Sequence, residues 1–519
     1  MILYHVITIY HLLNAIVHRA KYHPEEHSLL ILPDFFSQFF SPDQCHELME
    51  KHFFDEIYFF PYQKCNQINE EEVIAISTKF MDNSIPYEIS AFNSIYVWGV
   101  HFFFTLGLIE RGISFTGAEE AAGAFSKQEI CRDAIKANKL HYELAEKNGL
   151  LDYSNEFMLK IICNLSLQKE EMLKNPRLTD FAVVYELLQL PQVTQQDILR
   201  LFRAPSIIKF AGKQTLLLTQ HFMNLDLLSY EEQKEIYLTF ADYFLNATKL
   251  VIKPHPSDYM DYCNIFPGCE ILSPTFPIEL LPLLCNCAET TLATIYSTGI
   301  DNIKNCFRKT ISLNMAYRDA YTVTPAFWLS LKILLSLSEN ITTIGVIGVN
   351  TLLLETLIHE KCKRKIHLSE ITPDDQDLPA WIIIDDISQS TFDRNRLQNL
   401  LFHVNADKTN YIFINSKHDY CYYEFENRQI CRDIIPVNYQ YLNRKNEILI
   451  LSKNQSTKER IKKFSMSETL NYSKEKIETC PMSEEEIRIA ILEGTLQATE
   501  ERLQYYIQLV NDIRNGRCR

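Results

Sequence analysis

Three short motifs between residues 250 and 300 carry side chains that could hold a nucleotide and stabilise a departing phosphate. They are Lys253-Pro254-His255-Pro256, Phe276-Pro277-Ile278-Glu279-Leu280 and Ser297-Thr298-Gly299. Two prolines fix the backbone around His255, so its imidazole can be aimed at a phosphate oxygen or act as a general acid. Glu279 could accept two ribose hydroxyls. Ser297, Thr298 and the backbone N–H groups of a helix start could bind the phosphate.

Each motif also has a purely structural interpretation. A histidine between prolines can be a surface turn, Glu279 can face a helix dipole, and Ser297 and Thr298 can cap a helix. The apolar run 250–252 directly before Lys253, together with the order of the motifs, favours ligand binding. Parallel α/β sheets bind their ligands beyond the C-terminal ends of strands.

Parallel sheets must position these motifs, and strand and helix patterns do alternate along the chain. Strand-like runs at 2–8, 28–32 and 57–60 accompany a helical pattern at 10–22; strands at 215–219 and 249–252 flank a helix at 230–247. We also expect a strand at 73–77, a buried helix or strand at 94–108 and helical structure from 127 to 194. The pattern predicts two Rossmann-like α/β domains, residues 1–205 and 206–335.

A further α/β unit, residues 336–453, and a helical tail, residues 454–519, are expected to follow. Gly345-Val346-Ile347-Gly348 is only half of a dinucleotide-binding fingerprint. Asp385-Asp386 follows a strand-like run and could suggest a metal, but no other ligands accompany the pair. We therefore predict neither a metal site nor a cofactor.

Composition narrows the class of protein. The 519 residues carry a net charge of −15, which argues against broad nucleic-acid binding. The fourteen cysteines form no CxxC pairs, the N-terminus lacks a secretion signal, and no apolar run reaches the length of a membrane span. The run 327–335 could contact a membrane or form a buried helix. We expect a cytoplasmic protein with reduced thiols that admits peripheral association with an inner membrane.

The succession K-P-H-P, F-P-x-E-L-L and S-T-G resembles the bacterial sialyltransferases and polysialyltransferases that build capsules and lipooligosaccharides. The resemblance covers about residues 1 to 320, and Thr8-Ile9-Tyr10-His11-Leu12-Leu13 is similar to the family's opening strand, loop and helix. It implies the GT-B fold, with residues 1–205 as the acceptor domain and 206–335 as the nucleotide-sugar domain. It also implies a CMP-sugar donor, a glycan or glycolipid acceptor, and metal-independent inverting transfer.

The resemblance also implies roles for individual residues. His255 would protonate or contact the leaving phosphate, Glu279 would hold the ribose, and Lys253, Pro256, Ser297, Thr298 and Gly299 would complete the nucleotide site. Thr8, Tyr10 and His11 would lie on the acceptor side. The family's catalytic base belongs to an acidic pair followed by glycine, which we match to Glu110-Arg111-Gly112. Arg111 replaces the second acid, so Glu119 or Glu120 are alternative bases.

Two other functions stay open. A CDP-polyol phosphotransferase of the teichoic-acid type would use a similar histidine-proline motif and late hydroxyls. A non-catalytic partner in a polysaccharide assembly complex would account for Arg111 and for the long C-terminal extension. The acceptor, the linkage and the oligomeric state have no signal in the sequence.

Overall fold

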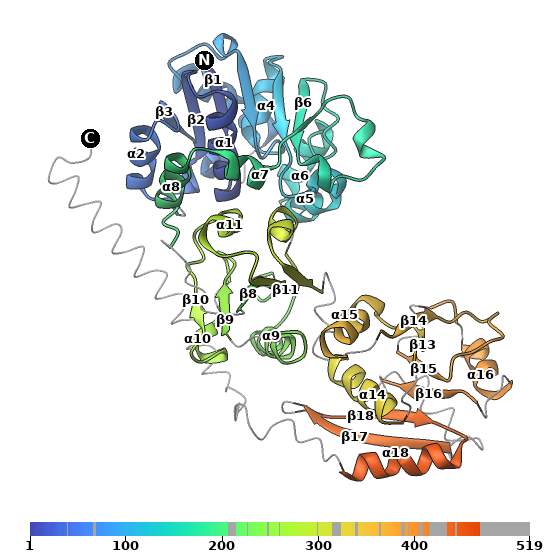
Figure 1. The fold of residues 1–519 in the computed structure, drawn as a ribbon. Coiled ribbons are helices and arrows are strands. Elements are labelled where there is room, and N and C mark those ends of the chain that lie inside the picture. The colour runs from blue at the N-terminus through green and yellow to red at the C-terminus, as the bar shows by residue number, and fades with distance from the viewer. Residues whose placement is uncertain are drawn as a thin grey trace.

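The computed structural model describes residues 1–467, apart from 39, 66–68, 137, 206–213, 226, 246–248, 259, 298, 314–322, 338–340, 363–364, 386–389, 393, 404–407, 415–432 and 442–443. Three β-sheets follow one another along this part of the chain (Figure 1). Thr298 and most of the predicted helical tail lie outside the described residues.

The first sheet has seven parallel strands in the order β3-β2-β1-β4-β5-β6-β7. The strands are β1 (Ile2–His5), β2 (Ser28–Pro33), β3 (Glu56–Phe60), β4 (Ser94–Val97), β5 (Phe115–Ala118), β6 (Met158–Cys163) and β7 (Leu178–Asp180). Because β1 pairs with both β2 and β4, the sheet reverses its strand order at β1. The loop after β1 therefore lies where doubly wound sheets bind ligands.

Eight α-helices within the described residues accompany this sheet: α1 (Ile9–Tyr22), α2 (Pro42–Glu50), α3 (Glu70–Asn83), α4 (Phe103–Glu110), α5 (Gln128–Ile135), α6 (Lys139–Lys147), α7 (Val183–Gln189) and α8 (Gln192–Leu201). The predicted strand at 73–77 is wrong, because these residues belong to α3. Asn69 and Glu72 form a capping box at its start, and three glutamates occupy its first turn. The region 127–194 also holds the strands β6 and β7 besides its expected helices.

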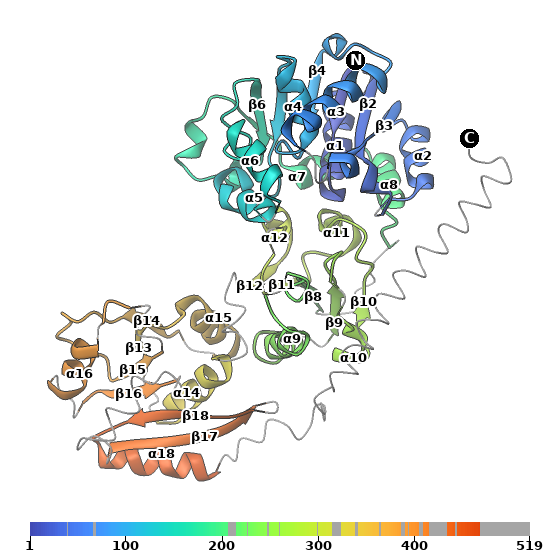
Figure 2. The ribbon, with the colours of Figure 1, turned by 180° about the vertical axis from the view of Figure 1, so that it is seen from behind.

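The second sheet repeats the same plan with five parallel strands in the order β10-β9-β8-β11-β12. The strands are β8 (Gln214–Leu218), β9 (Lys249–Lys253), β10 (Glu270–Ile271), β11 (Thr290–Thr294) and β12 (Lys309–Ser312), and the helices are α9 (Tyr230–Phe244), α10 (Tyr262–Ile265), α11 (Leu281–Leu284) and α12 (Ile300–Ile303). Here the strand order reverses at β8. In both views α11 and α12 lie between this sheet and the first domain (Figure 1, Figure 2).

The third sheet is mixed, in the order β14-β13-β15-β16-β18-β17, and only its last two pairings are antiparallel. Its strands are β13 (Thr343–Ile347), β14 (His367–Glu370), β15 (Trp381–Ile384), β16 (Asn410–Phe413), β17 (Ile434–Tyr441) and β18 (Arg444–Leu451), with helices α14 (Thr324–Leu337), α15 (Thr351–Lys361), α16 (Arg394–His403) and α18 (Gln455–Ser467). A Cβ on Gly345 would lie 2.9 Å from Ile371, Ile382 and Pro379 side chains. Close packing therefore accounts for this glycine of the half fingerprint.

Shared apolar cores join the three sheets. One core combines residues of the first two domains, such as Leu12, Phe202 and Leu218, and another joins the second and third from Leu217 to Ile461. The apolar run 327–335 lies within α14, which packs on α15, α18 and β18. This is the buried-helix alternative for that run. None of the described helices combines the length and apolar character needed to cross a membrane.

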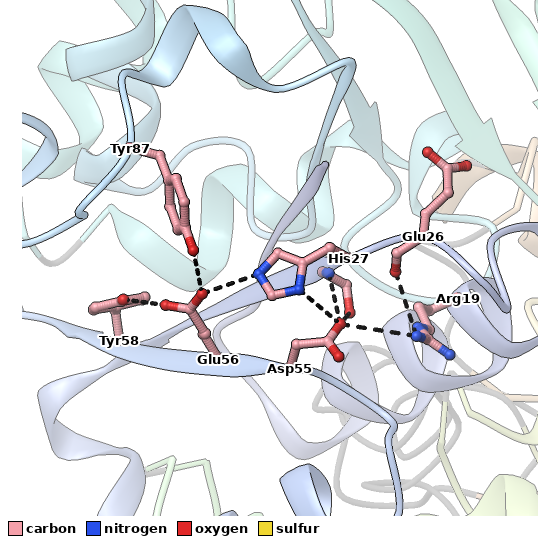
Figure 3. A network of polar contacts seen from close by, with 8 residues as sticks. Arg19, Glu26, His27, Asp55, Glu56, Tyr58 and Tyr87 are labelled. Atoms are coloured by element: carbon pink, nitrogen blue, oxygen red, sulfur yellow. Dashed lines mark hydrogen bonds and ion pairs between the residues drawn. The ribbon is translucent and has the colours of Figure 1, made fainter.

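A polar cluster ties β2 and β3 together where both strands begin (Figure 3). Asp55 accepts hydrogen bonds from the backbone N–H of Ser28 at 2.8 Å and from its hydroxyl at 3.1 Å. His27 lies 3.0 Å from Glu56, which also accepts from Tyr87 at 2.7 Å and from Tyr58. Burial would raise the pKa of Glu56, but these three partners lower it. The cluster stabilises the end of the sheet where β2 and β3 begin. The candidate site lies at the opposite end, where the strands finish.

Candidate active site

One cavity of about 590 Å³ lies between the first two domains, at the C-terminal ends of their strands. The loops after β1 and β8, the two strands where the sheets reverse their order, both contribute to its wall. Its lining comprises residues 7–10, Phe35, Phe102 and residues 120–122 of the first domain, and 218–220, 253–256, 275–279, Ser297, Gly299 and Asn302 of the second.

Most of the residues singled out in the sequence meet at this cavity. The lining includes Thr8 and Tyr10 from the predicted acceptor side, and Lys253, His255, Pro256, Glu279, Ser297 and Gly299 from the predicted nucleotide site. His11 is fully buried behind the wall, in α1. Glu110 is not brought to the cavity: it is exposed at the end of α4.

The loop that carries His255 is held by a network centred on Asp258. This carboxylate accepts hydrogen bonds from the hydroxyls of Thr219 (2.5 Å) and Tyr262 (2.6 Å), and the His255 carbonyl accepts from the Asp258 N–H at 2.9 Å. The backbone N–H of Ser257 donates to Nδ1 of His255 at 3.1 Å, so the neutral imidazole carries its proton on Nε2. The loop therefore presents the histidine in one tautomer as a donor.

A second imidazole, that of His221, stacks on His255 with ring centroids 4.0 Å apart and planes 19° apart. Burial lowers the pKa of His255 to about 3, and His221 and Lys253 add to that effect. His255 is thus neutral at physiological pH and meets an incoming phosphate as a hydrogen-bond donor.

Lys253 is buried within the cavity wall. Its ammonium donates to the carbonyls of Pro254 (3.3 Å) and Pro274 (3.1 Å) and lies 4.6 Å from the Phe276 ring centroid. Burial lowers the pKa of Lys253 to about 7, and the nearby Glu279 carboxylate opposes this shift. The lysine therefore joins the histidine loop to the loop before Glu279, with a charge that is only partly present at neutral pH.

Asn302 links the two halves of the cavity. Its amide donates to Glu279 Oε1 at 2.9 Å and to the Tyr10 hydroxyl at 3.3 Å, across the domain boundary. Glu279 is 3% exposed, and burial raises its pKa, while Asn302 and Lys253 counteract the rise. A carboxylate held this way can still accept hydroxyl donors from the cavity, because each oxygen has two lone pairs.

The hydroxyl motif lies before α12, which has only four residues and therefore little helix dipole of its own. Ser297 and Gly299 line the cavity, and a Cβ on Gly299 would lie 2.5 Å from Cδ1 of Ile278. The missing side chain at Gly299 leaves space for Ile278 in the cavity wall.

Two adjacent glutamates after β5 differ in environment. Glu119 accepts from Asn164 N–H and from Gln168, both at 3.0 Å, and burial raises its pKa to about 7. Glu120 lines the cavity, with its carboxylate near His11 and His101. Of the three glutamates that the sequence offers as bases, Glu120 alone lines this cavity.

Several residues in or behind the cavity wall were not singled out in the sequence. Thr219 and Gln220 follow β8 directly, so the strand-end rule that selects Lys253 could have found them as well. Asn302 and His101 have no motif of their own, because their roles depend on contacts between distant segments. Among the described residues, no group of three or more His, Cys, Asp or Glu side chains is arranged to hold a metal ion. Asp386 lies outside the described residues.

Two Rossmann-like sheets that face one ligand-sized cavity define the architecture of GT-B enzymes, as the sequence predicted. Residues 179–313 match the model of glycosyltransferase family 52, a bacterial sialyltransferase family. The matched segment contains all three motifs of the predicted nucleotide site. The match confirms the predicted resemblance and classes this part of the chain with glycosyltransferases.

The chain also resembles individual proteins. An uncharacterized protein of Haemophilus influenzae is 36% identical over 88 residues, which is 17% of this chain and spans only 28% of that relative. A UDP-GlcNAc 2-epimerase of Methanocaldococcus jannaschii has a TM-score of 0.38 at 14% identity, covering 60% of this chain and 84% of its own. An α/β-galactoside α-2,3-sialyltransferase of Photobacterium phosphoreum has a TM-score of 0.36 at 12% identity, covering 71% and 98%. These structural likenesses are too distant to carry an argument about activity.

Proposed function

We propose that this protein is a sialyltransferase-like glycosyltransferase, which transfers a sugar, sialic acid in our proposal, from a CMP-sugar to a hydroxyl of a surface glycan. One observation carries the proposal: a histidine, a buried carboxylate and a serine of one domain line the same cavity as a carboxylate of the other. The family 52 match over residues 179–313 supports it independently.

In the proposed donor complex the nucleotide occupies the second-domain side of the cavity. Glu279 accepts the ribose hydroxyls, and Ser297 and the Nε2–H of His255 donate to the phosphate. Lys253 supplies positive charge from beneath, and its pKa rises when the phosphate approaches. Preorganised donors of this kind contribute about 3 kcal/mol each to transition-state stabilisation in other enzymes.

The proposed reaction is a single inverting displacement at the anomeric carbon. The acceptor oxygen forms a bond to that carbon as its proton passes to Glu120. The bond from the carbon to the phosphate oxygen breaks, and its electron pair leaves with CMP. Because His255, Ser297 and Lys253 meet the developing charge, we propose that transfer proceeds without an added divalent ion, and that chelator leaves the rate unchanged.

A donor screen tests this proposal. Purified protein is offered CMP-sialic acid with a galactose-terminated glycan, and CDP-glycerol or CDP-ribitol in parallel, and release of CMP is measured for each. We expect release from CMP-sialic acid and loss of at least about 100-fold in kcat for His255→Ala and Glu120→Gln. His46→Ala is the control, since His46 is an exposed histidine on α2.

The outcomes separate the candidate functions. Release from the CDP-polyols alone would replace the proposal with the teichoic-acid type of transfer. Failure of the protein to bind CMP in a calorimetric titration would favour a non-catalytic partner in polysaccharide assembly. Full activity of His255→Ala would remove the mechanism while leaving the donor class intact.

We further propose that the reaction serves capsule or lipooligosaccharide synthesis in the cytoplasm, with peripheral association at the inner membrane. Nine cysteines are free thiols in the part of the chain whose side chains the structure describes, which supports a reducing compartment. Sedimentation of the protein with inner-membrane vesicles, and its release by salt, would test the association.

A further inference from the structure

The proposed base, Glu120, is surrounded by histidines from three separate elements. Nε2 of His101, in the loop before α4, lies 3.3 Å from Glu120 Oε2, and Nε2 of His11, in α1, lies 3.6 Å from Oε1. His141, in α6, lies behind His101 with its Nε2 3.2 Å from Nδ1 of that ring. Of these side chains only Glu120 lines the cavity.

The hydrogen bonds determine where the protons lie. His141 Nε2 is 3.0 Å from the His101 carbonyl, which can only accept, so His141 carries a proton on Nε2 and shares it with Nδ1 of His101. Nδ1 of His101 is then an acceptor, and its own proton is on Nε2, facing Glu120. His11 by contrast donates from Nε2 to the Glu120 backbone carbonyl at 2.9 Å. The carboxylate thus has one imidazole nitrogen at ion-pair distance, 3.3 Å, from a defined oxygen, Oε2, which is buried and makes no hydrogen bond to any described residue.

Burial of these three imidazoles costs free energy of folding, and a functional role would explain why the fold keeps them. His101 and His141 are 4% and 6% exposed, and His11 is fully buried with Nδ1 lacking a hydrogen-bond partner. Apolar side chains could fill the same space at less cost in free energy of folding. Phe102, which lines the cavity, covers His101 at a centroid distance of 4.5 Å and so shields the pair from solvent.

We propose that His101, backed by His141, is a positioning residue for the Glu120 base. Its Nε2 side faces Oε2 of the carboxylate at 3.3 Å and favours the charged form electrostatically, and the other oxygen, Oε1, receives the proton of the acceptor hydroxyl. His101 keeps its own proton throughout, so the transfer of atoms and electrons is that of the displacement described above. This inference rests on the proposed function, because it names the residue that positions the base of the proposed reaction.

The charges around Glu120 agree with this assignment. Burial alone would raise the pKa of Glu120, but the facing imidazoles of His11 and His101 outweigh it and lower the pKa to about 2. Of the other titratable groups nearby, burial lowers the pKa of His141 to about 4 and that of His5 to about 3, raises that of Tyr62, and raises that of the adjacent Glu119 to about 7. Tyr153 accepts from the Glu120 N–H at 3.2 Å. Removal of His101 should therefore raise the pKa of Glu120.

The test compares His101→Phe, which fills the space without a donor, with His101→Gln, whose amide can still donate. For His101→Phe we expect kcat to fall by about tenfold or more, with the CMP dissociation constant within about twofold of the wild type. The acid limb of kcat/KM should move upward by at least about one pH unit, because the base loses a group that favours its ionised form. His101→Gln should recover most of kcat, and His46→Ala should change none of these quantities.

Each outcome has a defined meaning. A His101→Phe enzyme with wild-type kcat and an unmoved acid limb would overturn the inference, and so would a loss of kcat equal in the Phe and Gln variants without a change of pH profile. If His101→Phe does not fold, His141→Phe is measured instead, because it removes the group that fixes the His101 tautomer, and the same outcomes apply. Failure of the wild type to bind CMP or to transfer sugar would refute the proposed function itself. That outcome is distinct from those of the His101 variants, which are compared with an active wild type.

Discussion

Lys253 should make the stability of this protein rise with pH in a range where most proteins do not gain stability. The ammonium is 2% exposed, and burial lowers its pKa from 10.5 to about 7. Between these values the unfolded chain binds a proton that the folded chain has released. The free energy of unfolding therefore increases as pH rises from about 7 towards 10, and the lysine destabilises the fold below that range.

The magnitude follows from proton linkage. Integration from pH 7 to pH 9 gives a gain of about 2 kcal/mol from this one side chain. For a unit of 150 to 250 residues, that gain corresponds to a rise of about 4–8 °C in the melting temperature. Lys253→Met removes the titrating group and keeps the length of the side chain, so the melting temperature of the variant should lack this rise.

Scanning calorimetry of both proteins at pH 7, 8 and 9 measures the effect as the difference between their melting temperatures. Lys139→Met is the matched control, because Lys139 has a side chain that is 86% exposed at the start of α6. The melting temperature of the wild type should rise relative to that of Lys253→Met as the pH increases. The melting temperature of Lys139→Met should change with pH as that of the wild type does. Parallel curves for all three proteins would refute the reasoning that Lys253 is held partly neutral.

Three other substitutions test separate parts of the structure. Glu110→Ala should leave kcat/KM within about twofold of the wild type, because this side chain is exposed away from the cavity; a 100-fold loss would restore Glu110 as base. Gly299→Ala should push Ile278 into the cavity and cost about 1–3 kcal/mol of CMP binding in calorimetry, and adding Ile278→Ala should restore the affinity. Asp55→Ala should lower the free energy of unfolding in urea by about 1–3 kcal/mol, because the buried Ser28 N–H loses its acceptor, with Asp55→Asn less affected.

The second-domain residues that line the cavity could be brought together from the sequence because their signals are local. Lys253 ends an apolar strand and His255 follows it, Glu279 follows a proline that begins a turn, and Ser297 follows another strand. Each of these cues lies within a few residues of the side chain that it identifies. Parallel pairing then brings all of these strand ends to one edge without further information.

The first-domain carboxylate could not be assigned in the same way. Glu110 ends a helix, so it lies at the edge of the sheet where the next strand begins, whereas Glu120 follows β5 and lies at the edge where strands end. β5 has only four residues, including a glycine, and gives little strand signal in the sequence. Asn302 and His101 are harder still, since each acquires its role from partners that lie in other elements of the chain.

The apolar core that runs from Leu217 to Ile461 has a consequence for how this protein can change over evolutionary time. The helix α14 contributes to it from the end of the second domain and packs on elements of the third. Exchange of the C-terminal part with that of a relative would mismatch side chains on both sides of that helix at once. The sugar-transfer machinery and its C-terminal neighbour are thus expected to be inherited together, with compensating substitutions on the two sides of the shared core.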